Sequence, residues 1–100
     1  FNVDGNGNRV AALAFGPQNV ILVVGCNKIV EDLHEAHRRL RHLAAPANTK
    51  RLNRNTPCAK TGICADCRSP ERICCTYTVQ RFSKTPGRIK VILVAEPLGY

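Results

Sequence analysis

The placement of cysteines is the feature that most restricts how this chain can fold. Five of its six cysteines lie between Cys58 and Cys75. Four of them follow the spacing C-x5-C-x2-C-x6-C, namely Cys58, Cys64, Cys67 and Cys74. Thiols gathered in one segment indicate a metal site, a disulfide cluster or a redox switch. The remaining residues must therefore form a fold that holds this segment together.

A four-thiolate metal site is the reading that the spacing favours. Thiolates are soft, charged ligands for zinc and for iron–sulfur clusters. Cys64-x-x-Cys67 has the spacing of a chelating turn whose backbone N–H groups can reach the sulfur atoms. A zinc ribbon usually has two such pairs and this segment has one, so an iron–sulfur cluster (4Fe-4S) is slightly favoured over zinc. We expect Cys58, Cys64, Cys67 and Cys74 to be the ligands, with Cys75 able to replace Cys74.

Two other readings of the cysteines are less favoured. Small disulfide-rich scaffolds spread their cysteines along the chain, whereas here they are clustered in one segment. A thioredoxin-type dithiol normally opens a helix after a strand, and Thr61-Gly62-Ile63 does not supply that strand. Cys26 lies apart from the cluster, after an apolar run, and is expected to be a small core residue.

The rest of the chain has the pattern of an α/β domain. The continuous apolar run Val20–Val24 predicts a strand covered on both faces, as in a parallel sheet. An apolar stripe over 30–45 predicts a helix that Pro46 terminates. Segments 76–82 and 88–94 predict two strands joined by a turn, as a hairpin or edge pair. We therefore expect a mostly parallel sheet with flanking helices, and the cysteine-rich loop 57–75 before the last two strands.

A glycine loop near the start is a second candidate site. A strand over Asn2–Asp4 is expected to enter it, and Asn8 is expected to cap a short helix that follows. The dinucleotide fingerprint would require glycine at Val10, so the loop does not match it. It is either a simple turn or an anion site that uses backbone N–H groups and a guanidinium. The candidate cofactor-binding residues are Gly5, Gly7, Asn8 and Arg9.

Charge and composition restrict the classes of partner that the chain can have. The chain has 100 residues, enough for one domain, and a net charge of +8. Such an excess of positive charge suggests a partner that is nucleic acid, an anionic small molecule or an acidic protein. Alternatively, it offsets the negative charge of thiolates around a metal. Only five residues are aromatic, which argues against stacking on nucleic acid.

No apolar run reaches the roughly 20 residues that span a bilayer. His34, His37 and His42 are more consistent with a solvated helix face than with metal ligation.

Several segments carry a family resemblance: Val3–Ala12, Phe15–Pro17, Val20–Gly25, Asn27–Val30, Thr56–Cys64 and Ser69–Cys74. They resemble the LUD domain of the lactate-utilization protein family, in its small bacterial and archaeal branch with a cysteine loop. The resemblance implies that residues 1–100 are the C-terminal part of a single LUD-like domain whose N-terminal part is missing. It also implies a fold like the ribose-5-phosphate isomerase, glucosamine-phosphate deaminase and CoA-transferase group.

The resemblance further implies a role in L-lactate or other 2-hydroxy acid utilization, alongside iron–sulfur or oxidoreductase partner subunits. We expect a cytoplasmic protein that forms a homo-oligomer. The glutamate nucleophile of CoA transferases has no match among Glu31, Glu35, Glu71 and Glu96, so no catalytic residue is implied. The leading hypothesis is electron transfer through the cysteine site. The alternative is a CoA- or phosphate-binding enzyme in which zinc only holds the cysteine loop.

Overall fold

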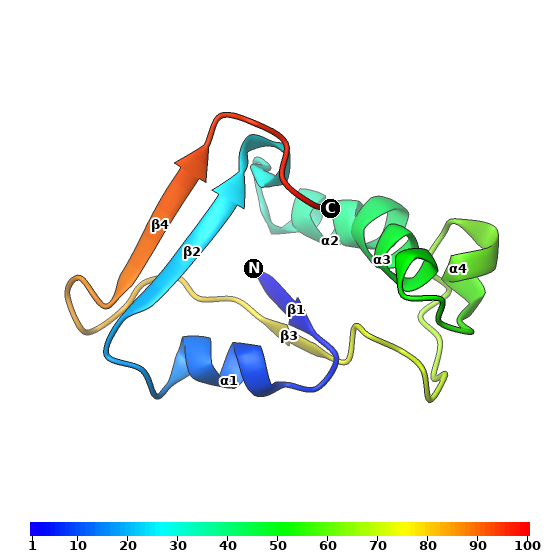
Figure 1. Ribbon diagram of the computed structural model, residues 1–100, viewed down its shortest axis with the longest axis horizontal. Coiled ribbons are helices and arrows are strands. Elements are labelled where there is room, and N and C mark those ends of the chain that lie inside the picture. Colours follow the sequence, from blue (N-terminus) through cyan, green and yellow to red (C-terminus); the bar gives the residue numbers. More distant parts are fainter.

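The structure, a computed structural model, describes residues 1–100 and is built from two small sheets and a set of helices. Strands β2 (Val20–Gly25) and β4 (Ile89–Val94) form one sheet, and β1 (Asn2–Asp4) and β3 (Thr76–Thr78) form the other. Figure 1 shows the β2–β4 sheet at one end of the molecule and the cysteine loop with its helices at the other. The expected α/β class is confirmed, and the likeness to a particular fold group stays a prediction.

The two sheets differ in direction. β2 and β4 are parallel, with Val20 opposite Ile89 and Gly25 opposite Val94. β1 and β3 are antiparallel, with Val3 opposite Tyr77. A single, mostly parallel sheet is therefore not what the chain forms.

The predicted C-terminal hairpin is wrong, because β3 and β4 belong to different sheets. The guanidinium of Arg88, just before β4, donates to the carbonyls of Ala12 and Leu13 at 2.9 and 2.8 Å and to that of Pro17 at 2.8 Å. These bonds satisfy carbonyls at the end of the first helix and hold the start of β4 beside β2. The apolar run of β4 consequently pairs with the apolar run of β2.

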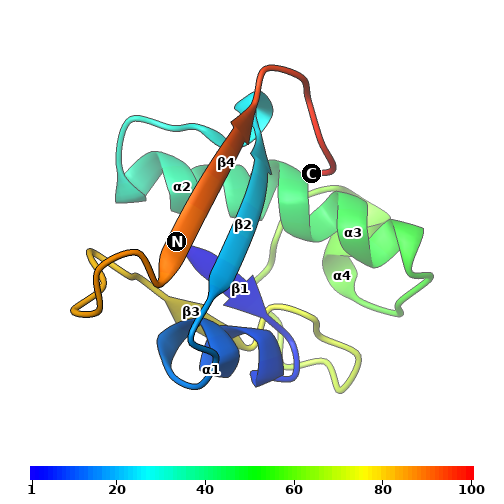
Figure 2. The ribbon, with the colours of Figure 1, turned by 60° about the vertical axis from the view of Figure 1, so that its left-hand side comes forward.

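A long helical segment crosses behind the β2–β4 sheet (Figure 2). It consists of α2 (Leu33–Arg39), a π-helical turn η2 (Leu40–Ala44) and α3 (Ala45–Arg51). Asp32 caps its start by accepting the Glu35 N–H at 2.8 Å. The prediction that Pro46 ends the helix is wrong. Proline lacks the N–H that a helix interior needs, and the π turn places Pro46 in the first turn of α3, where that lack is tolerated.

The first helix, α1 (Asn8–Ala14), follows the glycine loop. Its N-cap residue is Gly7, with φ +80°, and not Asn8 as predicted. This positive φ is accessible to glycine at little cost, which explains why the cap position moves back by one residue. After β2, the short 3-10 helix η1 (Cys26–Lys28) leaves Cys26 exposed, so the prediction of a core cysteine is wrong.

Most of the buried residues lie around α3 and the cysteine loop rather than in the β2–β4 sheet. Nine residues are buried, among them Ala45, Thr49, Thr56, Cys58 and Cys74. In contrast, Ile21 and Val23 on β2 are 61% and 58% exposed, so the expected burial of both faces of this strand is wrong. None of the helices combines the length and the hydropathy needed to cross a bilayer.

Candidate metal centre

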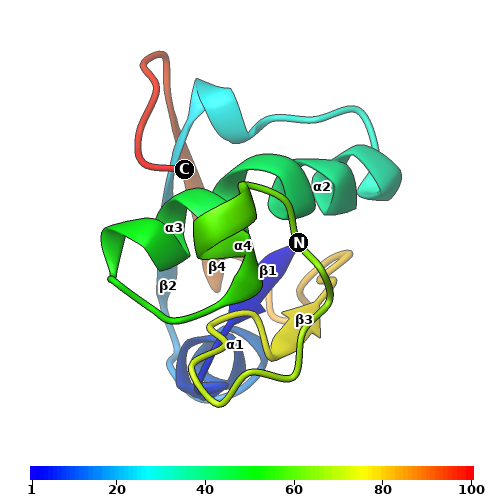
Figure 3. The ribbon, with the colours of Figure 1, turned by 90° about the vertical axis from the view of Figure 1, so that its right-hand side faces the viewer.

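The cysteine loop begins with a short helix that packs against α3 (Figure 3). This helix, α4 (Pro57–Thr61), starts with proline at its first position and ends at Gly62, whose φ is +79°. Proline is tolerated where no intrahelical N–H is required, and glycine adopts the left-handed conformation that ends a helix. The Gly62 N–H donates to the Cys58 carbonyl at 2.9 Å. The proline and the glycine thus fix the ends of α4, and this short helix presents the Cys58 side chain to α3.

Cys58 lies in a polar niche of two threonines. The residue is 5% exposed, and its Sγ is 3.4 Å from the hydroxyls of both Thr49 and Thr56. The Thr49 hydroxyl also donates to the Ala45 or Pro46 carbonyl, at 2.9 and 3.0 Å. Thr56 has no other side-chain partner, so its hydroxyl is free to donate to a Cys58 thiolate. Sequence reasoning missed both threonines, although Thr56-Pro57-Cys58 is the signal that places one of them.

Cys64 is anchored at both its backbone and its sulfur. Its N–H donates to the Arg41 carbonyl in η2 at 3.0 Å, and its Sγ accepts the Asp66 N–H at 3.3 Å. Asp66 has a φ of +47°, a conformation that aspartate tolerates better than most residues. This is the turn predicted for Cys64-x-x-Cys67, in which a backbone N–H reaches the first sulfur.

Arg72 holds the second half of the loop. Its guanidinium donates to the carbonyls of Cys67 and Cys74, to Asp66 Oδ1 at 3.1 Å and to the Tyr77 hydroxyl at 3.3 Å. Burial alone would lower the pKa of Arg72, but the bond to Tyr77 and the charge of Cys74 outweigh it, so the pKa is raised. The guanidinium therefore stays charged beside the thiols. Sequence patterns offered no signal for this role.

Cys74 points inward and Cys75 points outward. Cys74 is 7% exposed, whereas Cys75 is exposed and its thiol donates to the Arg72 carbonyl at 3.5 Å. Adjacent residues in extended chain face opposite sides, so only one of the two can face the loop interior. The structure selects Cys74 for that position.

Electrostatics link three of the candidate ligands. Burial raises the pKa of the Cys74 thiol, and the charges of Cys64 and Cys58 raise it further, while Arg72 offsets part of the shift. Burial also raises the pKa of Tyr77, with Cys74 and Cys64 contributing. Cys74 is thus close enough to Cys58 and Cys64 for their charges to raise its pKa, and Arg72 donates to the backbone carbonyls of both Cys67 and Cys74. No three of the chain's Cys, His, Asp and Glu side chains stand as an assembled ligand group.

The glycine loop already holds an anion of its own. The carboxylate of Asp4 accepts the N–H groups of Asn6, Arg9 and Val10 at 3.2, 2.9 and 3.2 Å. These bonds and the charge of Arg9 lower the pKa of Asp4, although its partial desolvation acts in the opposite direction. Sequence reasoning assigned these N–H groups to an external anion and missed Asp4. Its position just before the glycine loop was the available signal.

The glycine loop and the cysteine loop border one cleft of about 650 Å³. A Cβ atom on Gly5 would lie 3.2 Å from the Cα of Ile73, so the two backbones approach closely. The Cys75 N–H also donates to the Asp4 carbonyl at 3.0 Å. The predicted residues Gly5, Asn8 and Arg9 line the cleft, and Gly7 does not.

The histidines lie outside these contacts. The His37 ring is 4.7 Å from the Phe1 ring and 5.8 Å from the Tyr77 ring, measured between centroids. His34 and His42 take part in no hydrogen bond or ion pair through their side chains in the structure.

The comparisons with known proteins give one match. The model of the family described as the LUD domain matches residues 1–94. No curated protein and no solved structure matches the chain.

Proposed function

The chain belongs to the LUD domain family, which is associated with lactate utilization, and from this premise we propose that its loop 57–75 is a metal centre. The proposed ligands are the thiolates of Cys58, Cys64, Cys67 and Cys74. The chemistry of this donor set suits zinc or an iron–sulfur cluster, and it does not suit magnesium or calcium, which prefer oxygen ligands.

The observation that carries the proposal is the burial of Cys58 and Cys74 in a chain with so few buried residues. Nine of 100 residues are buried, and two of these are cysteines, of which Cys58 helps to raise the pKa of Cys74 through its charge. The Asp66 N–H donates to the Cys64 sulfur, and the Thr56 hydroxyl lies 3.4 Å from the Cys58 sulfur, where it can donate to a thiolate. Donors of this kind orient thiolates and tune a bound metal.

The loop also supplies charge for such a site. Four thiolates carry more negative charge than a divalent metal or a cluster neutralises. Arg72 is the cation in direct contact with the loop backbone, and its own partners keep it charged. When bound, an iron–sulfur cluster would supply one-electron transfer, whereas zinc would only hold the loop closed. We favour the cluster, serving the oxidation of lactate or another 2-hydroxy acid by a partner oxidoreductase.

Metal analysis tests the proposal directly. Protein purified without oxygen and reconstituted with iron and sulfide should show visible absorption and about four irons per chain for a 4Fe-4S cluster. Zinc reconstitution should give about one zinc per chain if the site is structural. Cys58→Ser and Cys74→Ser should lose the metal, and Cys26→Ser is the matched control, since Cys26 is exposed and far from the loop in sequence. A chain that takes up neither metal would end the proposal.

The cleft between the two loops supports a second candidate, the binding of a phosphate group or CoA. Arg54 lines the cleft together with Arg9 and Asn8, and its guanidinium takes part in no hydrogen bond or ion pair. Inorganic phosphate or CoA should then raise the melting temperature, and Arg54→Gln should abolish this rise. Arg81→Gln is the matched control because Arg81 lies outside the cleft. A rise that survives Arg54→Gln would argue against the site.

A further inference from the structure

A second cavity, of about 760 Å³, lies between β2, β1 and α2, and none of its lining residues belongs to the cysteine loop. Its walls are mainly apolar, with Val3, Leu13, Leu22 and Leu40 among them. Its volume falls within the range of small-molecule sites, roughly 300–1,000 Å³. Neither the family assignment nor the proposed metal centre gives this cavity a role.

The charged residues of the cavity are all cations. Arg9, Lys28 and Arg39 line it, and no aspartate or glutamate does. Arg9 is offset by Asp4, whose Oδ2 is 4.0 Å from the Arg9 Nε. Lys28 and Arg39 have no carboxylate within salt-bridge distance. An apolar cavity with two uncompensated cations therefore has a field that favours an anion.

Arg39 lines the cavity from α2. Its Nε donates to the Asn27 carbonyl at 3.0 Å, while its Nη2 is buried without any hydrogen-bond partner. A buried charged donor left unpaired is costly, so a nearby negative charge would stabilise it. Because this Nη2 atom is covered, it would act on a bound anion through its field rather than by contact.

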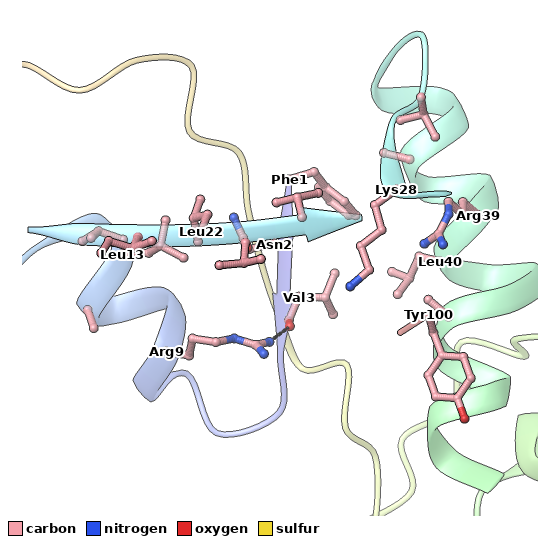
Figure 4. Close-up of a pocket in the computed structure, with 18 of the residues that line it drawn as sticks. Phe1, Asn2, Val3, Arg9, Leu13, Leu22, Lys28, Arg39, Leu40 and Tyr100 are labelled. Atoms are coloured by element: carbon pink, nitrogen blue, oxygen red, sulfur yellow. Dashed lines mark hydrogen bonds between the residues drawn. The ribbon is translucent and has the colours of Figure 1, made fainter. Parts of the chain in front are cut away.

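Lys28 is the cation that a ligand can reach. Figure 4 shows its side chain extending from beyond the end of β2 into the space between Val3 on β1 and Leu40 on the helix. Its Nζ takes part in no salt bridge, and the residue is exposed. A lysine ammonium on an apolar wall suits a compact anionic head group whose body covers the wall.

We propose that this cavity binds an amphiphilic monocarboxylate, with its head group on the Lys28 ammonium and its aliphatic body along the apolar wall. One reachable cation supported by a second, covered one suits a single negative charge. The shortage of polar groups in the wall disfavours a sugar or a nucleotide, which would leave hydrogen bonds unmade.

Calorimetric titration of the full chain with decanoate, below its micelle concentration, tests the proposal. We expect saturable binding at one ligand per chain, with affinity rising up to about fourfold per methylene from hexanoate to decanoate. Lys28→Gln should weaken decanoate binding about tenfold, the loss expected for one hydrogen bond to a charged group. Lys28→Arg should restore most of the affinity. Lys84→Gln should change nothing, because Lys84 is exposed and does not line the cavity.

Three results would overturn the proposal: no saturable binding of decanoate, equal affinity in Lys28→Gln, or equally tight binding of decyltrimethylammonium. The last would show an apolar surface with no preference for charge. Far-UV circular dichroism of each variant establishes that the fold is intact. Because the cavity and the cysteine loop share no residue, the loss of metal in Cys58→Ser leaves this test unaffected.

Discussion

The backbone N–H of Cys64 donates to the carbonyl oxygen of Arg41 at 3.0 Å, which ties the cysteine loop to the π turn of the long helix. The Arg41 carbonyl is free for this bond for two reasons. The Ala45 N–H donates to the Leu40 carbonyl instead, and Pro46 has no N–H to donate. A proline in the helix thus creates the acceptor that positions a candidate metal ligand.

Pro46→Ala tests this relationship. The substitution adds an N–H that can compete for the Arg41 carbonyl, so the Cys64 amide should lose its acceptor for part of the time. We expect hydrogen exchange of the Cys64 amide to speed up about tenfold, as for the loss of one hydrogen bond of about 1.4 kcal/mol. The melting temperature should not fall, since alanine favours the helix.

Pro86→Ala is the control for this exchange measurement, because Pro86 lies in the exposed turn before β4. Unchanged protection of the Cys64 amide in Pro46→Ala would show that the π turn does not depend on proline.

Arg72→Gln should destabilise the cysteine loop and the fold around it. Arg72 makes four side-chain hydrogen bonds to loop and β3 residues, and its removal leaves the Cys67 and Cys74 carbonyls without this donor. We expect the free energy of unfolding in urea to fall by about 2–3 kcal/mol. Arg68→Gln should cost little, since the Arg68 side chain makes no hydrogen bond or ion pair. Equal losses in the two variants would contradict the role of Arg72.

Thr56→Val should weaken the proposed metal site without unfolding the chain. Valine matches threonine in shape, so the change removes the hydroxyl that lies 3.4 Å from the Cys58 sulfur and leaves the packing. Loss of a donor to a metal ligand typically lowers metal affinity by about 10–100-fold. Competition of the zinc-loaded protein with a chelator measures this affinity. Thr85→Val is the control, and comparable affinities in both variants would rule out a contribution from Thr56.

Local sequence patterns predicted the elements better than their partners. The apolar run Val20–Val24 lies in β2, and the stripe predicted over 30–45 lies in the long helix from Leu33 onward, because both depend on periodicity along the chain. The pairing of β4 depends on Arg88 reaching carbonyls more than 70 residues earlier, which no local pattern reveals. Pro46 misled the prediction because a π turn overrides the ordinary rule for proline in helices.

The candidate ligands could be named from spacing, whereas the groups that support them could not. The spacing of Cys58 to Cys74 is visible in the sequence, and the structure buries both of these residues. Thr49 and Arg72 act through side chains that meet the loop only after α3 and β3 are in place. The role of Asp4 depends on the turn at Gly7, which brings the N–H groups of Arg9 and Val10 onto its carboxylate.

Asp4→Asn should make the stability of the fold less dependent on pH in the acidic range. The pKa of Asp4 is lowered in the folded chain by the N–H groups of Val10, Asn6 and Arg9, against its own desolvation. Its stabilising effect is therefore complete above the unfolded pKa of about 3.9 and is lost as the pH falls through the lower folded pKa. In urea unfolding at pH 7, the free energy of unfolding of the wild type should exceed that of Asp4→Asn. This difference should shrink below about pH 4. Glu31→Gln is the control, since Glu31 is exposed and unpaired. A difference that stays constant down to pH 2.5 would mean that the Asp4 charge does not hold the glycine loop.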